Sequence, residues 1–299
     1  MDLKGVYPAM VTPLTPDENV DKAGMRKVVR FCLEGGVHGV VVLGSTGEFP
    51  AMTDAMRQDA IETVLDEVNG KVPVLIGCGD TGTKKTIEQV RVASKTKADG
   101  VLVAIPYYFP LDQGGVMRHF QAVADASTKP VVVYNFPQMT KIPIAPDTLA
   151  KLSAHPNIIG VKDSCGDFVN LQRFLEATGP GFTVFPGNPA LGLAGYQMGA
   201  KGGIYAGASL VPKLCADVYE AFVRGDLKTA VALQKKASLI PLMGQFGGNA
   251  AVIKFVLSIM GICGPTASAP MALNPGQEEK IFAWMRTLGV EVGGKAARA

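Results

Sequence analysis

Residues 100–105 read Gly100-Val101-Leu102-Val103-Ala104-Ile105, and Pro106 ends the run. An unbroken apolar run of this length, rich in β-branched residues, is typical of a parallel strand buried on both faces. Similar runs bounded by Gly, Pro, Asn or Asp recur along most of the chain, at Val6–Val11, Gly39–Leu43, Val72–Ile76, Pro130–Tyr134, Ile158–Lys162, Phe182–Phe185 and Gly202–Tyr205. We expect each of these runs to form one strand.

Longer segments with helical spacing separate the runs. Met25, Val28, Val29 and Cys32 share one apolar face, and residues 88–98 and 117–126 have a similar pattern. Eight alternations of strand and helix predict a (β/α)8 barrel of the α/β class. The main competitor is a doubly wound open sheet. It is disfavoured because the first run leads into Val11-Thr12-Pro13-Leu14-Thr15-Pro16, which lacks the glycines of a dinucleotide turn.

The part of the chain after about residue 206 contains helical patterns but no further strand pattern. Helices are expected at 210–223, 227–239, 250–260 and 277–288. We therefore predict a barrel with its active site over residues 1–225 and a small helical extension, packed on the barrel, over residues 226–299. The tail from Gly293 to Ala299 is expected to fray.

Composition and charge exclude several classes of function. Hydrophobic residues make up 47% of the 299 residues and the net charge is only +3. Without a run of Lys or Arg, nucleic acid is not expected as a partner. The longest apolar stretch, Ala250–Cys263, is interrupted by Lys254 and is too short to cross a membrane, so it is interpreted as a buried helix.

Cysteine and histidine usage gives no sign of a metal or of disulfides. The five cysteines are scattered and form no C-x-x-C pair, and the three histidines lack metal-ligand spacing. We predict reduced thiols, no metal and no other cofactor. The N-terminal residues lack the apolar run of a signal peptide, which favours a cytoplasmic location.

Lys162 is the most informative single residue. It closes an apolar strand in which Ile158, Gly160 and Lys162 share one face. Barrel active sites lie at the carboxyl ends of the strands. Burial there disfavours the charged ammonium, and the free amine can then attack a ketone to form an iminium, which stabilises a carbanion at the neighbouring carbon. The structural alternative is a lysine paired with Asp163 or another carboxylate.

Two neighbouring features fit such chemistry. Tyr134 closes the preceding strand, and because adjacent strands lie about 4.8 Å apart its phenol can meet the same substrate and carry protons. Its alternative is a core tyrosine bonded to backbone. The turn Gly44-Ser45-Thr46-Gly47 offers N–H groups and hydroxyls that suit a carboxylate or a phosphate.

Four motifs together resemble the dihydrodipicolinate synthase / N-acetylneuraminate lyase family over nearly the whole chain. They are Gly44-Ser45-Thr46-Gly47-Glu48, Pro106-Tyr107-Tyr108, Tyr134-Asn135-Phe136-Pro137 and Gly160-Val161-Lys162-Asp163-Ser164. The resemblance implies a (β/α)8 barrel, a lyase that uses pyruvate, and a homotetramer arranged as a dimer of dimers.

The resemblance also implies residue roles. Lys162 matches the Schiff-base lysine and Tyr134 matches the proton-carrying tyrosine. Ser45 and Thr46 match the pair that holds the pyruvate carboxylate, Thr46 also belonging to the hydroxyl relay. Tyr108 resembles the tyrosine that is lent to this relay across a subunit interface. Two further positions, Gly187 and Ile204, match the lining of the keto-acid pocket.

Two departures from the family pattern concern the second substrate. Met139 stands where the synthase branch carries an arginine for a substrate carboxylate, and Lys141 is the only nearby replacement. Asn188-Pro189 stands where the lyase branch places acidic residues for sugar hydroxyls. Apolar side chains dominate the remaining mouth residues, which are Phe49, Phe109, Phe136, Met139, Phe246 and Asn249. A less polar second half of the substrate is therefore expected.

The sequence thus predicts a Schiff-base aldolase that forms or cleaves the bond between pyruvate and an aldehyde in a 4-hydroxy-2-oxo acid. Alternatives on the same lysine are a dehydratase or hydrolase of a 2-keto(-3-deoxy) acid, and 4-hydroxy-tetrahydrodipicolinate synthase. A keto-acid sensor without catalysis is less consistent with the retention of an amine. A phosphate-binding barrel would have to use the glycines at residues 202–207.

Overall fold

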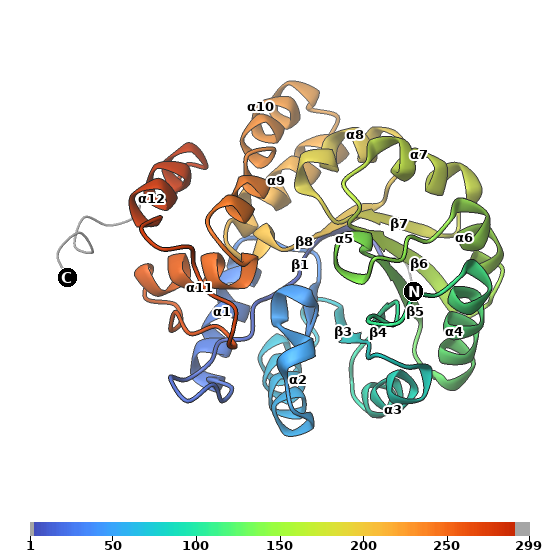
Figure 1. Ribbon diagram of the computed structural model, residues 1–299. Helices are drawn as coiled ribbons and strands as arrows, with labels where there is room; N and C mark the ends of the chain where they lie inside the picture. Colours follow the sequence, from blue (N-terminus) through green and yellow to red (C-terminus); the bar gives the residue numbers. More distant parts are fainter. Residues whose placement is uncertain (1–2, 291–299) are drawn as a thin grey trace.

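The computed structural model describes residues 3–290, so the predicted fraying of residues 293–299 lies outside the described part of the chain. Eight parallel strands form the centre of the molecule and helices surround them (Figure 1). The strands are β1 (Gly5–Pro8), β2 (Val40–Val42), β3 (Val74–Cys78), β4 (Gly100–Ala104), β5 (Val131–Asn135), β6 (Ile158–Asp163), β7 (Thr183–Pro186) and β8 (Gly202–Tyr205).

Strand pairing closes the sheet into a barrel. Strands β2 to β7 are hydrogen-bonded in sequence order, and β1 pairs with β8. The N–H of Met10, beyond the end of β1, donates to the carbonyl of Val41 in β2 over 3.0 Å, and β7 packs beside β8. The predicted α/β barrel is confirmed. The strand predicted from Val72 begins at Val74 because Pro73 has no N–H to donate to a ladder.

The helices follow the strands around the barrel. They are α1 (Lys22–Glu34), α2 (Asp54–Val68), α3 (Thr83–Ser94), α4 (Gln113–Ala126), α5 (Pro137–Thr140), α6 (Pro146–Ser153), α7 (Phe168–Ala177), α8 (Gly192–Gln197), α9 (Pro212–Val223), α10 (Leu227–Ala237), α11 (Asn249–Ile259) and α12 (Glu278–Thr287). Short 3₁₀ helices are η1 (Ser45–Gly47), η2 (Phe49–Ala51), η3 (Pro189–Leu191), η4 (Gly207–Ser209) and η5 (Ile240–Gln245).

Local sequence signals explain where several helices begin. The side chains of Asp21, Thr53, Asp112, Asp167 and Asp226 each accept a hydrogen bond from a backbone N–H in the first turn of the helix that follows. These bonds satisfy N–H groups that have no partner within the helix. Helix α3 ends at Ser94, earlier than the sequence pattern indicated.

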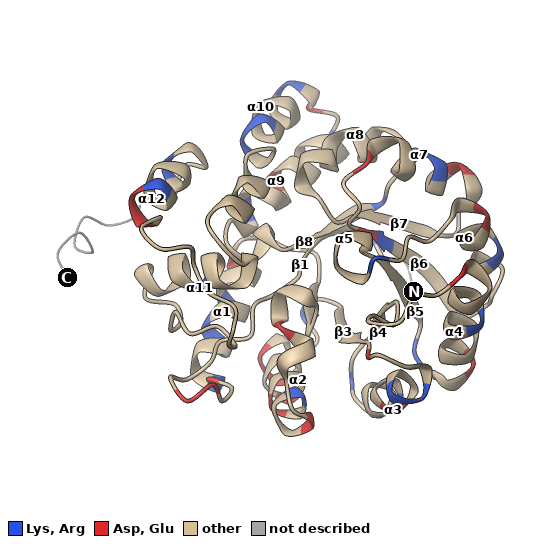
Figure 2. Ribbon diagram, in the orientation of Figure 1, with Lys and Arg blue, Asp and Glu red and all other residues tan. Residues whose placement is uncertain are grey.

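Charge is concentrated on the outer helices, whereas most strand residues are uncharged (Figure 2). Helices α11 and α12 lie at one side of the barrel (Figure 1), and the apolar stretch of α11 is buried as predicted. Among residues 3–290, no helix is both long and apolar enough to cross a membrane. The division of the chain at residues 225 and 226 stays a prediction.

Candidate active site

Lys162 lies near the carboxyl end of β6 and is buried, with 4% of its surface exposed. Its neighbours in register are Tyr134 in β5 and Phe185 in β7. The Lys162 Nζ atom is 4.3 Å from the centre of the Tyr134 ring. The structure therefore brings together the two residues that the sequence singled out first.

Tyr134 connects the lysine with the turn after β2. Its ring stacks on Phe136 at a centroid distance of 5.7 Å and is only 4% exposed. Its phenol oxygen accepts a 3.4 Å hydrogen bond from Ser45 Oγ. Because this phenol contacts a hydroxyl side chain, the alternative of a core tyrosine bonded only to backbone does not describe it. The Tyr134 side chain therefore contacts both the Ser45 hydroxyl and the Lys162 amine.

The turn itself is held in an unusual backbone conformation. Leu43 and Glu48, on either side of it, have φ angles of 59° and 60°, which side-chain-bearing residues seldom adopt. The carbonyl of Gly47 accepts a 2.8 Å bond from Thr12 Oγ1, and the N–H of Glu48 donates to Ser45 over 3.1 Å. Thr46 is buried at 8% exposure. These contacts hold the turn whose Ser45 hydroxyl lies beside Tyr134.

Asp163 does not pair with Lys162. Its carboxylate accepts hydrogen bonds from Asn135 Nδ2 at 2.7 Å and from Asn170 Nδ2 at 3.0 Å. It also accepts from the Cys165 N–H at 3.2 Å and from its thiol at 3.0 Å. Within residues 3–290 no ion pair involves Lys162, so the alternative of a salt-bridged lysine finds no support there. Burial, together with the adjacent Asp163, raises the pKa of the Cys165 thiol to about 12.

Two predicted pocket residues lie on the next strands around the barrel. Gly187 follows β7, and its N–H donates to the Asp163 carbonyl at 2.6 Å. A Cβ added at Gly187 would lie only 2.0 Å from Ser164 Oγ, so a side chain does not fit there. Ile204 in β8 is fully buried.

The remaining predicted residues lie in the segments that follow β4, β5 and β7, which we call the rim. Met139 is 67% exposed and Tyr108 is 84% exposed. Tyr108 has a φ angle of 90° and its ring lies edge-on to Phe109. Its high exposure shows that its side chain is not packed against the core of the same chain. Lys141 Nζ donates to the Gln138 carbonyl at 2.8 Å, and the Asn188 side chain caps η3 through a 3.0 Å bond from the Ala190 N–H.

Two groups of polar residues near this end of the barrel were missed in the sequence. Arg57 is buried and donates to the carbonyls of Phe49 and Gly77 and to the Gln89 side chain. Desolvation lowers the pKa of its guanidinium. Glu48 and Lys254 form a buried ion pair. The interruption of an apolar helix by Lys254 was the available signal, because a buried lysine needs a partner.

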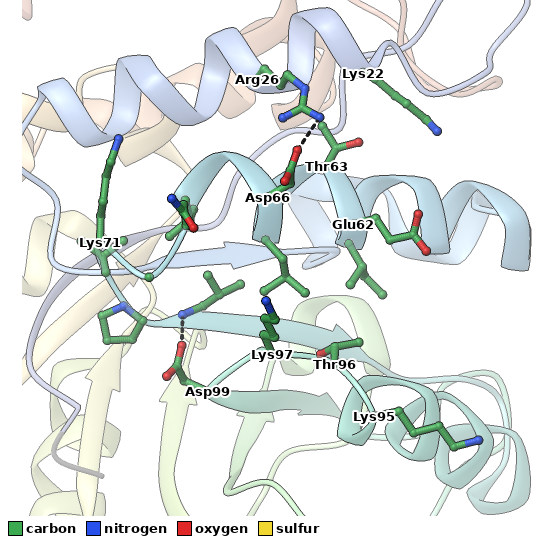
Figure 3. Close-up of a pocket in the computed structure, with 18 residues that line it drawn as sticks. Lys22, Arg26, Glu62, Thr63, Asp66, Lys71, Lys95, Thr96, Lys97 and Asp99 are labelled. Carbon is green, nitrogen blue, oxygen red and sulfur yellow. Dashed lines mark hydrogen bonds and ion pairs between the residues drawn. The ribbon is translucent and has the colours of Figure 1, made fainter.

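A separate groove of about 950 Å³ lies at the other end of the barrel, between the end of α2 and the amino ends of β3 and β4 (Figure 3). Arg26 pairs with Asp66 across it at 2.7 Å, and Asp99 accepts a 2.8 Å bond from the Val74 N–H. Lys71 and Lys97 also line it. The groove contains none of the predicted site residues.

Comparison with known proteins identifies the kind of enzyme to which this geometry corresponds. A family model described as the dihydrodipicolinate synthetase family matches residues 2–286. The chain is 37% identical, over 273 residues, to a 4-hydroxy-tetrahydrodipicolinate synthase of Methanospirillum hungatei JF-1, covering 90% of this chain and 92% of that relative.

Solved structures with a similar fold belong to the same family. YagE, a prophage protein of the dihydrodipicolinic acid synthase family from E. coli K12 in complex with pyruvate, superposes with a TM-score of 0.93 at 29% identity, covering 97% of this chain and 100% of YagE. The chloride-inhibited dihydrodipicolinate synthase of Acinetobacter baumannii complexed with pyruvate also has a TM-score of 0.93, at 26% identity and the same two coverages.

Proposed function

The chain belongs to the dihydrodipicolinate synthetase family of pyruvate-dependent class I lyases, and we propose that its Lys162 forms a Schiff base with pyruvate and joins that pyruvate to an aldehyde. One observation carries this proposal. The Lys162 amine is buried, has no carboxylate partner within residues 3–290, and lies against the ring of Tyr134. A buried amine without a carboxylate partner, beside a phenol, is suited to act as a nucleophile.

The chemistry follows from the amine. Lys162 Nζ attacks the keto carbon of pyruvate, and the carbinolamine loses water to give an iminium. Loss of a methyl proton then gives an enamine. Its carbon attacks the aldehyde carbon while the aldehyde oxygen takes up a proton, and water releases a 4-hydroxy-2-oxo acid. The same steps in reverse cleave that acid.

The neighbouring hydroxyls supply the proton transfers and the carboxylate site. Tyr134 gives and takes the protons of the carbinolamine steps, with Ser45 as its partner at 3.4 Å. Ser45 and Thr46, together with N–H groups of the turn, hold the pyruvate carboxylate. Gly187 and Ile204 line the keto-acid site, and the lack of a side chain at Gly187 lets Ser164 pack against its backbone.

The rim residues favour an aldehyde with little charge. Met139 cannot bind a carboxylate, and the Lys141 ammonium is already bonded to the Gln138 carbonyl. Asn188 Oδ1 accepts from the Ala190 N–H at the start of η3, so the amide oxygen of this side chain is occupied. We therefore infer that the second substrate is an aldehyde whose non-reacting end is apolar.

A second candidate is 4-hydroxy-tetrahydrodipicolinate synthase, which is favoured by the name of the relative at 37% identity. This activity uses an aldehyde that carries a carboxylate, so Lys141 would have to leave the Gln138 carbonyl and bind it. A dehydratase or hydrolase of a 2-keto acid would use the same amine without a second substrate.

Assembly and domain organisation remain part of the proposal. Tyr108 and Phe109 are exposed at 84% and 63%, and an apolar loop tip of this kind is suited to burial against a second copy of the chain. We propose a homotetramer in which Tyr108 completes the relay of a neighbouring subunit. We also propose that α10 to α12 form a helical extension of the barrel, and that the enzyme works in the cytoplasm.

The first test is intact-protein mass after borohydride reduction in the presence of pyruvate, with wild type beside Lys162→Ala. We expect one reduced pyruvate adduct in the wild type and none in the variant. Lys254→Met is a control for loss of another buried lysine and should still give the adduct at saturating pyruvate. Absence of an adduct in the wild type would overturn the covalent mechanism.

The second test separates the candidate activities. Purified enzyme is incubated with pyruvate and either an apolar aldehyde or an aldehyde bearing a carboxylate, and in the other direction with the matching 4-hydroxy-2-oxo acids. We expect higher kcat/KM with the apolar aldehyde. Preference for the carboxylate-bearing aldehyde would favour the synthase, and loss of water without pyruvate release would favour the dehydratase.

A further inference from the structure

A buried ion pair connects the turn after β2 with helix α11. Lys254 Nζ, from the middle of α11, pairs with Glu48 Oε1, and the side chains are 0% and 1% exposed. Removing two charges from water carries a large desolvation penalty, which the attraction between them offsets only partly. Fold stability alone is therefore a weak explanation for a pair at this depth.

The second oxygen of the Glu48 carboxylate is also used. Glu48 Oε2 accepts a 2.6 Å hydrogen bond from the N–H of Ser268. Both partners of the carboxylate thus come from the C-terminal part of the chain. Glu48 is also the residue that caps the C-terminal end of η1, with a φ angle of 60°. Strained backbone of this kind persists only where surrounding contacts hold it.

The two C-terminal partners are tied to each other. The N–H of Gly248, just before α11, donates to the Ala272 carbonyl at 3.2 Å, and the Asn274 N–H donates to the Phe246 carbonyl at 2.8 Å. The segment after Ser268 therefore returns to the beginning of α11. Lys254 and Ser268 therefore hold the Glu48 carboxylate from two C-terminal segments that are bonded to each other, and Glu48 directly follows the turn that carries Ser45 and Thr46.

We propose that Glu48 and Lys254 are positioning residues that hold Ser45 and Thr46 in the geometry that binds the substrate carboxylate. The pair touches neither pyruvate nor the reacting atoms; it acts through the backbone of the turn. This inference rests on the proposed function, because it assumes that the turn holds pyruvate.

The experiment measures how much pyruvate is needed to form half of the borohydride-trapped adduct. The variants are Glu48→Gln, Lys254→Met and the double variant Glu48→Gln/Lys254→Met. The double variant removes both charges at once, so no unpaired charge is left in the core, while the glutamine oxygen can still accept from Ser268. Circular dichroism and thermal unfolding establish that each variant is folded at the assay temperature.

We expect the half-saturating pyruvate concentration to rise about tenfold or more in the single variants and to stay raised in the folded double variant, because small displacements of a binding group cost this much. The adduct yield at saturating pyruvate should stay close to that of the wild type. Leu152→Ala in α6 is the control, because it weakens the core away from the turn and should leave half-saturation unchanged.

The result that overturns the inference is a folded double variant with wild-type half-saturation, which would leave the pair a role in stability only. A rise in Leu152→Ala equal to that in the double variant would overturn it as well. If the wild type itself forms no adduct with pyruvate, the proposed function fails first, and this outcome is visible before any variant is compared.

Discussion

The two ends of the barrel differ in how their charged groups are placed. At the carboxyl ends of the strands, Lys162 is 4% exposed and has no ion-pair partner in residues 3–290. In the groove at the amino ends, exposed or half-buried charges such as Arg26, Asp66 and Asp99 bond to each other or to backbone. The groove is an obvious hollow of about 950 Å³, yet its lining is typical of a solvated surface. An active site is indicated by a desolvated ionisable group with specific neighbours, and the volume of a cavity alone does not indicate one.

The largest expected effect is at the buried end. Tyr134→Phe should lower turnover by about 10²- to 10⁴-fold, because proton transfer to and from the carbinolamine loses its carrier. Steady-state assays with pyruvate and the best aldehyde measure this. Tyr205→Phe is the matched control, since it removes a buried phenol that is bonded to Tyr196 at 2.9 Å on β8. Equal turnover in the two variants would remove Tyr134 from the mechanism.

A substitution at Met139 can add a cation to the rim, where Lys141 is already bonded to the Gln138 carbonyl. Met139→Arg should improve the use of a carboxylate-bearing aldehyde by roughly tenfold in KM, because hydrogen bonds to charged groups contribute about 1.5–3 kcal/mol. Competition between the two aldehydes measures the change in preference. Val92→Arg, on the exposed face of α3, adds the same charge away from the mouth and should change nothing. An unchanged preference in Met139→Arg would place the second substrate elsewhere.

Close packing at the active end can be tested through stability. Gly187→Ala should lower the free energy of unfolding by about 1–3 kcal/mol, because the new methyl group would lie 2.0 Å from Ser164 Oγ. Urea unfolding measures the loss. Gly179→Ala has open space around the added methyl group and should be nearly neutral. A neutral Gly187→Ala would mean that Ser164 moves aside easily.

The smallest effect is expected in the groove. The double variant Lys71→Ala/Lys97→Ala should keep wild-type turnover and adduct formation, and its stability should change by no more than about 0.5 kcal/mol. The same urea titrations and steady-state assays apply. A marked loss of activity would break the contrast between the two ends, because it would link the groove to catalysis.

Much of the active end was predictable because it depends on strand order and residue chemistry. Lys162 and Tyr134 each close an apolar run, and consecutive parallel strands in a barrel are neighbours, so their meeting follows from the pattern. The Ser45 hydroxyl lies close to Tyr134, in the turn that the sequence predicts to hold a carboxylate. The groove, by contrast, has no sequence signal, since surface lysines and carboxylates occur throughout the outer helices.

The sequence by itself determined the barrel, the order of the strands that carry Lys162 and Tyr134, and the family to which the chain belongs. These depend on local periodicity and on short motifs that are read along the chain. Only the tertiary structure decided which partners Glu48, Lys254 and Arg57 find, that Asp163 turns away from Lys162, and that Lys141 bonds to the Gln138 carbonyl. Such pairings depend on side-chain direction and on contacts between segments distant in sequence, and local patterns do not encode either.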